Sequence, residues 1–256
     1  MATETIISFQ EVSKVYNEKT VVDQVNLAIQ KGEFITILGT SGSGKTTILK
    51  MMNRLIEPTS GKILFEGEEL SQLDPVSLRR RVGYVVQQIG LFPHMTIGEN
   101  IATVPKLLKW NQAEINARVK ELMNLIQLPY EEYSNRYPKE LSGGQQQRVG
   151  VARALAANPD VVLFDEPFGA IDAITRSSLQ EELRNIHRQL GDKTFIFITH
   201  DIYEAFRLGS RVLIMDQGKI CQFDSPEQII QSPQGAFVAN LIETVKEQEK
   251  IWRTYA

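Results

Sequence analysis

Cysteine, tryptophan and histidine are scarce in this chain of 256 residues, which contains one cysteine, two tryptophans and three histidines. Cys221 cannot close a disulfide within one chain, and no histidine or second cysteine lies near it at the spacing of a zinc site. We therefore expect Cys221 to be a small apolar core residue, and a reducing compartment fits this composition.

Long apolar runs and excess positive charge are also missing. The longest apolar runs, such as Val161–Phe164 and Phe195–Ile198, have the length of strands, whereas a membrane helix needs roughly 18 consecutive apolar residues. The start, Met1–Thr5, lacks the basic residues and apolar core of a secretory signal. The net charge is -3, which disfavours nucleic acid as a partner. We expect a soluble protein, for which another chain must supply any membrane span.

Short apolar runs alternate with longer helical patterns. Continuous apolar strands between helices predict a parallel sheet that is covered on both faces. The opening third differs, because its strands alternate in polarity and predict an antiparallel flank. The buried strands are expected over Phe34–Leu38, Val161–Phe164, Thr194–Ile198 and Val212–Met215, and the flank over Ile6–Tyr16, Val21–Ile29 and Lys62–Glu66.

Helices are predicted by apolar residues that recur at steps of three and four. Over Asn111–Gln127 these are Ile115, Val119, Leu122 and Ile126, and over Ala173–Leu190 they are Leu179, Leu183, Ile186 and Leu190. Asp172 is the expected N-cap of the second helix. A further helix is expected from Lys45 to about Arg54, and residues 89–158 are expected to form a mostly helical lobe inserted between strands.

A glycine-rich loop follows the first buried strand and opens a helix. Its residues are Gly39-Thr40-Ser41-Gly42-Ser43-Gly44-Lys45-Thr46. Glycines let backbone N–H groups approach phosphate oxygens, and the following helix adds the positive end of its dipole. Lys45 can reach the β- and γ-phosphates, and the Thr46 hydroxyl can coordinate magnesium. A glycine-rich turn with a chance lysine is the alternative, and the strand–loop–helix setting disfavours it.

Two carboxylates follow a second buried strand. Phosphoryl transfer needs a carboxylate for the metal and a group that orients the attacking water. Asp165 and Glu166 supply both at a strand's carboxyl end, where ligands of open α/β sheets bind. We expect Pro167 to bias Glu166 towards an extended backbone that aims its carboxylate off the strand. Two acidic residues at an exposed strand end are the alternative.

A third motif, Leu141-Ser142-Gly143-Gly144-Gln145-Gln146-Gln147-Arg148, opens another helix. Ser142 and Gln145 predict a capping box. Two glycines at a helix start lower its stability by roughly 1 kcal/mol each wherever they count as helical, so a purely structural reason for them is weak. They do create a second helix terminus that can bind an anion.

These motifs, in this order and over nearly the whole chain, resemble the ATP-binding-cassette family. The resemblance implies ATP and Mg²⁺ as cofactors, and an α/β P-loop NTPase core with a mostly parallel sheet, an antiparallel β flank and an inserted helical lobe. In one nucleotide-binding domain, residues 1–88 and 159–232 would form the core, 89–158 the helical subdomain and 233–256 a helical tail. Thr40 and the segment Gly169–Ile171 depart from the residues frequent in the family, and neither departure removes a catalytic group.

The resemblance also assigns residue roles. It implies that Tyr16 stacks on adenine, that Gln87 senses magnesium, and that His200 contacts the γ-phosphate. The catalytic residues it implies are Glu166, His200 and Lys45; the metal-binding residues are Thr46, Gln87 and Asp165; and the nucleotide-binding residues are Tyr16, Gly39, Thr40, Ser41, Gly42, Ser43, Gly44, Lys45, Thr46, Thr47, Gln87, Ser142, Gly143, Gly144, Gln145 and Asp172.

Several of these residues have an ordinary structural alternative. Tyr16 could pack on the sheet, and His200 could simply end a strand. We assign His94 and His187 to a loop and a helix face without a functional role. The run Arg79-Arg80-Arg81 is expected to be a solvated face.

The family resemblance implies partners as well. Two copies would pair head to tail, so that Ser142–Gly144 of one faces the phosphate loop of the other. A transmembrane permease would dock near Gln87–Thr96 at the cytoplasmic face of the cell membrane, with an extracytoplasmic solute-binding protein in the same system and no nucleic acid. Leu91 and Phe92 could form this docking surface, or they could simply anchor the helical lobe.

The segment Gln87–Ile97 resembles importers of osmoprotectants and quaternary amines such as glycine betaine, carnitine or choline. Uptake of a polar amino acid is the main alternative, and an ATPase without a transport role is disfavoured. Many such relatives carry regulatory modules after the cassette, so this chain either lacks them or is truncated. In the tail, Phe237, Leu241 and Ile242 share one helical face, and we expect it to pack on the core.

Overall fold

The computed structural model describes residues 4–87, 90–169 and 171–255. The chain forms two compact units. The first comprises the residues up to Gln72 and those from Ile198 onward, and the second comprises Leu73–Phe197. Strand β8 (Thr194–Thr199) carries the chain from the second unit into the first. The predicted division into a core and a helical subdomain with a boundary at 88/89 stays a prediction, and that boundary lies outside the described residues.

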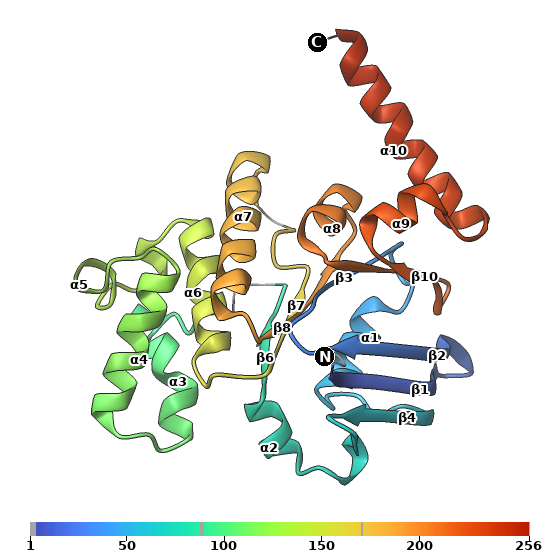
Figure 1. The fold of residues 1–256 in the computed structure, drawn as a ribbon. Coiled ribbons are helices and arrows are strands. Elements are labelled where there is room, and N and C mark those ends of the chain that lie inside the picture. The colour runs from blue at the N-terminus through green and yellow to red at the C-terminus, as the bar shows by residue number, and fades with distance from the viewer. Residues whose placement is uncertain (1–3, 88–89, 170, 256) are drawn as a thin grey trace. The chain divides into compact units, whose positions relative to one another are not determined.

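The antiparallel flank belongs to the first unit (Figure 1). Its strands are β1 (Thr5–Tyr16), β2 (Lys19–Gln30), β4 (Ser60–Phe65) and β5 (Glu68–Glu69), in the order β2-β1-β4-β5. Ile7 pairs with Ile29 on one side and with Phe65 on the other. Buried and exposed residues alternate along much of β2, so the predicted half-exposed flank is confirmed.

In the first unit, strand β3 (Phe34–Gly39) belongs to a second sheet and is buried along its whole length. It runs parallel to β9 (Arg211–Asp216), with Ile37 opposite Leu213. Strand β10 (Lys219–Asp224) returns antiparallel to β9, and the sequence did not predict it because polar residues interrupt its apolar ones. The helices of this unit are α1 (Lys45–Met52), α8 (Ile202–Leu208), α9 (Pro226–Gln231) and α10 (Gly235–Tyr255).

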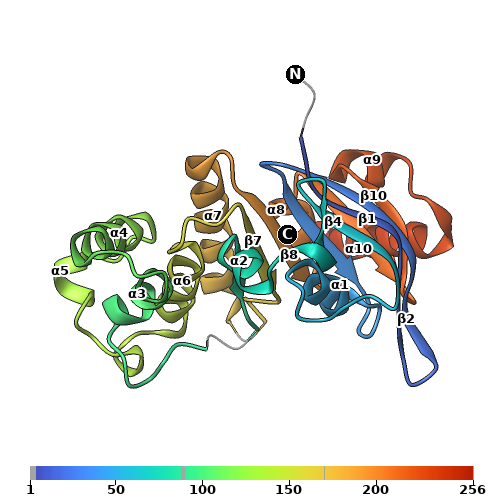
Figure 2. The same ribbon diagram turned by 90° about the horizontal axis from the view of Figure 1, so that it is seen from below.

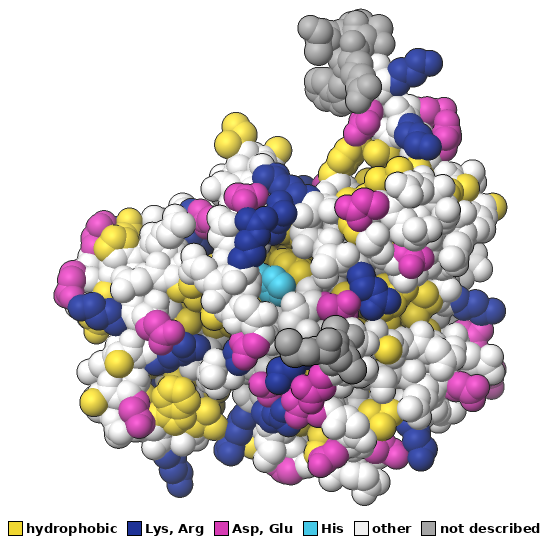
Figure 3. Space-filling model, viewed as in Figure 1, with side chains coloured by type: hydrophobic (Ala, Val, Ile, Leu, Met, Phe, Trp, Pro, Cys, Tyr) yellow, Lys and Arg dark blue, Asp and Glu magenta, His cyan; other side chains and the backbone are white. Residues whose placement is uncertain are grey.

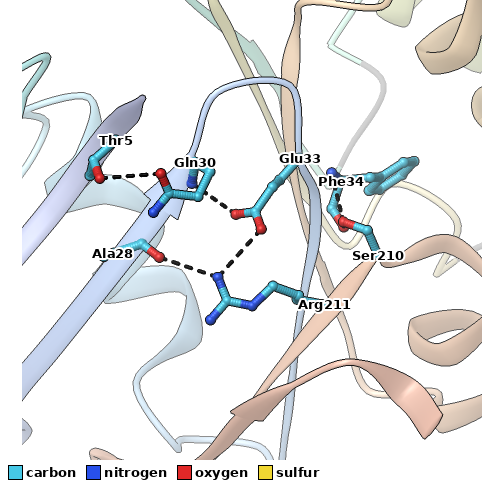
Figure 4. Close-up of polar contacts among 7 residues, drawn as sticks. All are labelled: Thr5, Ala28, Gln30, Glu33, Phe34, Ser210 and Arg211. Atoms are coloured by element: carbon cyan, nitrogen blue, oxygen red, sulfur yellow. Dashed lines mark hydrogen bonds and ion pairs between the residues drawn. The ribbon is translucent and has the colours of Figure 1, made fainter. Parts of the chain in front are cut away.

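Polar contacts hold the start of β3 in place (Figure 4). Glu33 accepts a hydrogen bond from the Gln30 amide at 2.8 Å and lies 3.4 Å from the Arg211 guanidinium. The Ser210 hydroxyl donates to the Phe34 carbonyl oxygen at 3.0 Å. These contacts tie the turn before β3 to the start of β9, and so define where the strand that carries the phosphate loop begins.

An apolar cluster joins α10 to the first unit. Val238 and Ile242 are buried against Ile214 of β9 and Ile229 of α9, and Cys221 packs against the same cluster while only half-buried. Figure 3 shows hydrophobic side chains gathered where α10 leaves the rest of its unit. The predicted packing of the tail through Phe237, Leu241 and Ile242 is confirmed.

Besides most of β8, the second unit contains the parallel strands β6 (Val82–Val85) and β7 (Val161–Asp165), with Gly83 opposite Val162. Helices α3, α4, α5 and α6 contact one another and are seen together in Figure 2. The helices of this unit are α2 (Pro75–Arg80), α3 (Ile97–Leu107), α4 (Gln112–Leu125), α5 (Tyr130–Tyr133), α6 (Gly143–Leu155) and α7 (Ala173–Leu190).

Aromatic rings fill the interior of the second unit. The Phe164 ring lies 5.2 Å from that of Phe195 and 5.9 Å from that of Phe197, centroid to centroid. His187 packs its ring on Phe195 at 4.9 Å, in keeping with an ordinary helix face. Such aromatic pairs add about 0.5–1.5 kcal/mol each beyond the apolar area they bury.

The predicted solvated face Arg79–Arg81 is only partly correct. Arg79 and Arg80 are exposed, but Arg81 forms an ion pair with Asp160 at 2.8 Å. The Asp160 amide also donates to the Arg81 carbonyl oxygen, so this pair fixes the chain where β6 and β7 both begin.

Two predicted helices end earlier than expected. Helix α1 stops at Met52, and Arg54 has a positive φ of 55°. Helix α4 stops at Leu125, before Gln127 with a φ of 56°. A left-handed residue interrupts the helical hydrogen bonds whatever the apolar pattern predicts. No helix in the described residues offers an apolar stretch of the length that would cross a bilayer.

Candidate functional site

The phosphate loop joins β3 to α1 in the first unit. Lys45 is the first residue of α1, and only 6% of its surface is exposed. Its ammonium donates to the carbonyl oxygens of Gly39 and Thr40, both at 2.9 Å. The Lys45 side chain, at the end of the loop, therefore reaches back to the backbone at the beginning of the loop. A buried ammonium needs such partners, and an anionic oxygen could take their place.

No side chain caps the start of α1, and in this sense we call that start open. Gly44 is its N-cap, with φ 101° and ψ 0°, and no side chain caps the first turn. That turn contains no acidic residue, so nothing there offsets the positive end of the helix dipole. Thr46 and Thr47 lie in the same turn and are half-buried. These are the conditions for an anion-binding helix terminus.

The glycines of the loop are required for different reasons. A Cβ atom on Gly39 would lie 2.3 Å from the Met215 carbonyl oxygen, and one on Gly44 would lie 2.7 Å from that of Val21. Gly42 has room for a side chain, but its φ of 79° disfavours one. The loop therefore packs tightly at both ends and adopts a backbone that glycine accepts most easily.

One buried hydroxyl of the loop lacks a hydrogen-bond partner among the residues that the structure describes. Ser43 is 2% exposed, and its Oγ makes no hydrogen bond with them. The Ser43 backbone is used, because its amide donates to Thr40 and its carbonyl oxygen accepts from the Gly218 amide. A buried hydroxyl without a hydrogen-bond partner could donate a hydrogen bond to a phosphate oxygen.

The candidate metal-binding side chains offer oxygen donors, which suit magnesium better than zinc. Within residues 4–87, 90–169 and 171–255, no group of three His, Cys, Asp or Glu side chains could hold a metal by itself. Mg²⁺ is commonly held by one or two protein oxygens together with phosphates and water. The Thr46 hydroxyl and the Asp165 carboxylate are donors of that kind, so the residues present fit the implied cofactors.

His200 follows β8 in the first unit and is exposed. A buried network shapes its surroundings. The Thr199 hydroxyl donates to the Glu204 carboxylate and accepts from the Asp201 amide at 3.0 Å. Asp201 in turn caps α8 by accepting from the amides of Tyr203 and Glu204. Thr199 and Asp201, on either side of His200, are therefore hydrogen-bonded to each other. Thr199 is also bonded to Glu204, which is 7% exposed.

Tyr16 is the last residue of β1 and is 41% exposed. The Lys14 ammonium lies 5.0 Å from its ring centroid. This exposure leaves open the structural alternative, in which the ring packs on the sheet. It is consistent with a ring that stacks on a base, and the stacking itself stays a prediction.

In the second unit, Asp165 is the last residue of β7 and is half-buried. Its Oδ2 accepts a hydrogen bond from the Tyr84 hydroxyl at 3.0 Å. Tyr84 lies on β6 opposite Leu163. Burial, and secondly the charge of Asp165, raise the pKa of the Tyr84 phenol, so it is a hydrogen-bond donor at neutral pH.

The predicted backbone of Glu166 is wrong. Pro167 favours an extended residue before it, yet Glu166 adopts a φ of 46°. The chain turns immediately after β7, and the Gly169 amide donates to the Glu166 carbonyl oxygen at 3.3 Å. This tight turn overrides the local preference. A strained backbone of this kind costs about 1–3 kcal/mol, and such residues cluster at functional sites.

The helix after the third motif, α6, has the predicted capping box. The Gln145 amide donates to the Ser142 hydroxyl at 3.3 Å, and the Ser142 amide donates to the Gln145 side-chain oxygen at 2.9 Å. Gly143 is exposed, and a Cβ atom there would meet nothing within 4 Å. Gly144 is buried, and its Cβ atom would lie 2.9 Å from the Thr175 methyl.

Helix α7 packs beside α6. Asp172 caps α7 by accepting from the Thr175 amide at 3.0 Å, and this hydrogen bond lowers the pKa of Asp172. Arg148 of α6 and Glu182 of α7 form an ion pair at 2.7 Å. Burial raises the pKa of Glu182, against the opposing effect of Arg148. Ala170, just before this helix, lies outside the described residues.

Gln87 is exposed at a bend two residues after β6, while Gln88 and Ile89 of the predicted docking segment lie outside the described residues. The loop that follows is held by Asn100, which is fully buried. Its side chain accepts from the Phe92 amide at 2.8 Å and donates to the carbonyl oxygens of Phe92, Met95 and Thr96. These hydrogen bonds give the loop from Phe92 to Thr96 a defined conformation.

Phe92 is 39% exposed, and the Arg153 guanidinium lies 5.5 Å from its ring centroid. Arg153 also donates to the Gly90 carbonyl oxygen at 2.7 Å, and burial lowers its pKa. Leu91 is half-buried, in keeping with a partial anchoring role. A groove of about 340 Å³ lies here, and its walls include Arg79, Tyr84, Gly90, Phe92, Val104 and Arg153.

The first unit thus contains Tyr16, the phosphate loop and His200, and the second unit contains Gln87, the capped start of α6, the two carboxylates and Asp172. Sequence reasoning missed Tyr84, Glu204 and Asn100. A polar residue inside the apolar run Val82–Val85 is a signal for Tyr84, and an acidic residue in the turn after His200 is one for Glu204. Asn100 gave no signal, because an amide on a helix predicts an exposed face.

Comparison with known proteins identifies the family. The ABC transporter family profile matches residues 22–169. The carnitine transport ATP-binding protein OpuCA of Listeria monocytogenes is 55% identical over 93% of this chain, and the match covers 59% of that relative. The glycine betaine uptake system ATP-binding protein YehX of Escherichia coli is 52% identical over 91% of this chain and 75% of the relative.

A solved structure agrees with the predicted fold. It is a dimeric, post-hydrolysis state of the ATP-binding cassette MJ0796 bound to ADP and Pi, with a TM-score of 0.74 and 34% identity over 86% of this chain and 98% of that one. The predicted α/β P-loop architecture is therefore confirmed. The chain spans only about three-fifths of the length of the Listeria relative. With the profile match over residues 22–169, these similarities show that the chain belongs to the ABC transporter family of ATP-binding cassettes.

Proposed function

We propose that this chain binds ATP with Mg²⁺ and hydrolyses it to energise solute import through separate transmembrane subunits. The observation that carries the proposal is the open N-terminus of α1, with the Lys45 ammonium held inside the loop that precedes it. Relatives named as transport ATP-binding proteins, at 52–55% identity, support it.

In the first unit, the residues from Gly39 to Thr47 would hold the phosphates through backbone amides and the charge of Lys45. The Thr46 hydroxyl would contribute one oxygen to magnesium. Tyr16 would stack on adenine, and His200 would donate to the γ-phosphate. These roles follow from donor chemistry, since charge in the transition state spreads over three phosphoryl oxygens and needs donors from several sides.

In the second unit, Asp165 would hold magnesium mostly through water, and Glu166 would orient the water that attacks the γ-phosphorus. Gln87 would sense the metal. Magnesium, when bound, neutralises charge on the β- and γ-phosphate oxygens. The attacking water would form the new bond to the γ-phosphorus as the bond to the bridging oxygen breaks, and would release a proton towards the Glu166 carboxylate, so that ADP and inorganic phosphate would leave.

A second copy of the chain would complete each nucleotide site. Ser142, Gly143, Gly144 and Gln145 of one copy would face the phosphates bound by the other, with Asp172 beside them. The exposed Gly143, with open space around it, supports this assignment. The similar cassette MJ0796, which was solved as a dimer, supports it too.

The Glu166→Gln substitution tests the composite site. We expect the variant to bind ATP, to hydrolyse it at least about a hundredfold more slowly because its water-orienting carboxylate is lost, and to accumulate as a dimer. Size-exclusion chromatography with excess ATP and magnesium measures the last effect. The matched control is Glu131→Gln, at an exposed site on α5. A Glu166→Gln variant that stays monomeric under these conditions would contradict the proposal.

The groove beside Phe92 is where a permease would dock. It combines apolar walls with the positive charges of Arg79 and Arg153, which suits a short helix with apolar side chains and an acidic residue. Charge or alanine substitutions at Leu91 and Phe92 should weaken copurification with the permease without lowering the ATPase activity of the isolated chain. Intact complex assembly in these variants would argue against this docking site.

The solute we propose is a quaternary amine such as glycine betaine, carnitine or choline, delivered by an extracytoplasmic binding protein. The chain would then act at the cytoplasmic face of the cell membrane. The names of the similar carnitine and glycine betaine proteins support this class over polar amino acids. Stimulation of ATP hydrolysis in the copurified complex by each compound tests it. Stimulation by amino acids alone would remove the solute proposal and leave the ATPase assignment standing.

A further inference from the structure

Tyr84 takes part in two features of the second unit at once. Its hydroxyl donates to the Asp165 carboxylate at 3.0 Å, and the residue forms part of the wall of the groove beside Phe92. We infer that Tyr84 is a positioning residue that couples occupancy of the groove to the orientation of the Asp165 carboxylate. The inference rests on the proposed function, in which Asp165 binds magnesium and the groove receives the membrane partner.

The Asp165 side of this link follows from strand geometry. Strands β6 and β7 are parallel, and Tyr84 lies opposite Leu163, two residues before Asp165. The Tyr84 phenol therefore reaches along β7 to the carboxyl end of that strand. Carboxylates that bind metals are usually oriented by a hydrogen bond from a neighbouring group, and loss of that group typically weakens metal affinity about 10–100-fold. The Tyr84 hydroxyl is such a group.

The groove side follows from the residues that surround the ring. Gly90, Phe92 and Arg153 line the same space as Tyr84, and Arg153 fixes the loop by donating to the Gly90 carbonyl oxygen at 2.7 Å. A partner side chain that enters this space meets Tyr84 next to Phe92 and Arg153.

The phenol transmits a displacement because it is rigid. Its ring and hydroxyl oxygen move as one body about two side-chain torsions. Any contact that shifts the ring must therefore shift the hydrogen bond to Asp165. Packed protein interiors respond to such shifts by moving between discrete arrangements, and do not absorb them.

The first test removes the hydroxyl and leaves the ring. For wild type, Y84F and the control Y130F, one measures metal-free binding of a fluorescent ATP analogue, and then Mn²⁺ binding to the nucleotide complex by electron paramagnetic resonance. Tyr130 lies on α5, with its ring 5.8 Å from the Lys120 ammonium, and is not one of the predicted site residues. We expect Y84F to bind Mn²⁺ about tenfold more weakly with unchanged metal-free nucleotide affinity, and Y130F to match wild type.

The second test fills the groove. In a C221S background, V104C is labelled with a benzyl methanethiosulfonate, which places a ring in the groove, and L107C, 71% exposed on the same helix, is the control. Labelling at position 104 should change Mn²⁺ affinity about threefold, reversibly on reduction, and should have no effect when combined with Y84F. The label at position 107 should have no effect in either background.

The outcomes separate this inference from the proposed function. A wild-type chain that bound no nucleotide would overturn both together. Normal nucleotide binding with equal Mn²⁺ affinity in wild type and Y84F would overturn the inference alone. So would a label at position 104 that changed Mn²⁺ affinity equally with and without Y84F, because the signal would then bypass the hydroxyl.

Discussion

The starts of α1 and α6 are both glycine-rich helix termini, yet they are built differently. Helix α1 begins at the left-handed Gly44 with no side-chain cap. Helix α6 begins at Ser142 in extended backbone, and a complete capping box with Gln145 satisfies two of its N–H groups. Both carry no acidic residue in the first turn, so both keep the positive end of the helix dipole.

The difference indicates two kinds of anion site. No side chain occupies the start of α1, so its positive helix end is suited to hold phosphates within its own chain. A capping box is worth about 0.5–2 kcal/mol and orders the helix start by itself. Helix α6 is therefore shaped before any ligand arrives, as the proposed dimer requires of a surface that would meet its ligand only when a second copy binds.

The largest expected effect comes from Gly44→Ala at the open start. Alanine at φ 101° is strained, and its Cβ atom would lie 2.7 Å from the Val21 carbonyl oxygen. We expect ATP affinity, measured by calorimetry, to fall at least about a hundredfold, with the free energy of unfolding lower by about 1–3 kcal/mol. Gly42→Ala is the control for strain without a clash, since nothing lies within 4 Å of its Cβ position. Equal effects of the two would refute the steric explanation.

A smaller effect, and one that separates stability from function, is expected at the capped start. Gly143→Ala meets no atom, so the free energy of unfolding should stay the same or rise by up to about 1 kcal/mol. ATP-dependent dimer formation should nevertheless weaken about tenfold, because a methyl group would stand where phosphate approaches.

Its matched control is Gly144→Ala, whose Cβ atom would lie 2.9 Å from the Thr175 methyl. That variant should lower the melting temperature through crowding of α7. If Gly143→Ala formed dimers as tightly as wild type, the exposed glycine would have no role in binding.

Removal of the cap itself should have a still smaller effect. Ser142→Ala removes an acceptor for the Gln145 amide and should lower the free energy of unfolding by about 1 kcal/mol in chemical denaturation. Ser225→Ala, which removes the equivalent cap of α9, should have a similar effect on stability. Only Ser142→Ala should also weaken ATP-dependent dimer formation, and a parallel loss in both variants would show that the effect is purely structural.

The smallest expected effect compares a charged cap with an uncharged one. A hydrogen bond from the Thr175 amide lowers the pKa of Asp172 below its unfolded value of about 3.9. Asp172 therefore adds stability above that unfolded value, and this stability is lost as the pH falls through the folded pKa. The difference in unfolding free energy between wild type and Asp172→Asn should be greatest at neutral pH and shrink below about pH 4. Ser142→Ala should show no such pH dependence.

The motifs and their chain order could be predicted because they depend on local chemistry. The loop Gly39–Thr46 has its strand before it and its helix after it, and glycine, lysine and threonine have few other reasons to share that pattern. The capping boxes and N-caps at Ser142 and Asp172 are likewise local, since each involves residues within three positions.

Other features failed at the sequence level because their causes are not local. The turn after β7 overrides the effect of Pro167 on Glu166. Arg81 pairs with Asp160, 79 residues away, only because β6 and β7 are neighbours. Strand β10 has too few apolar residues to stand out and forms by pairing with β9.

The sequence by itself determined the family, the fold class and the identity of the groups that can hold a phosphate, because those depend on residue types at fixed spacing. Only the tertiary structure decided which of two glycine-rich helix starts is open and which is capped and packed, and that Tyr84 reaches from a groove to Asp165. Strand pairing and helix packing bring such groups together across long stretches of chain, and no local pattern records these distances.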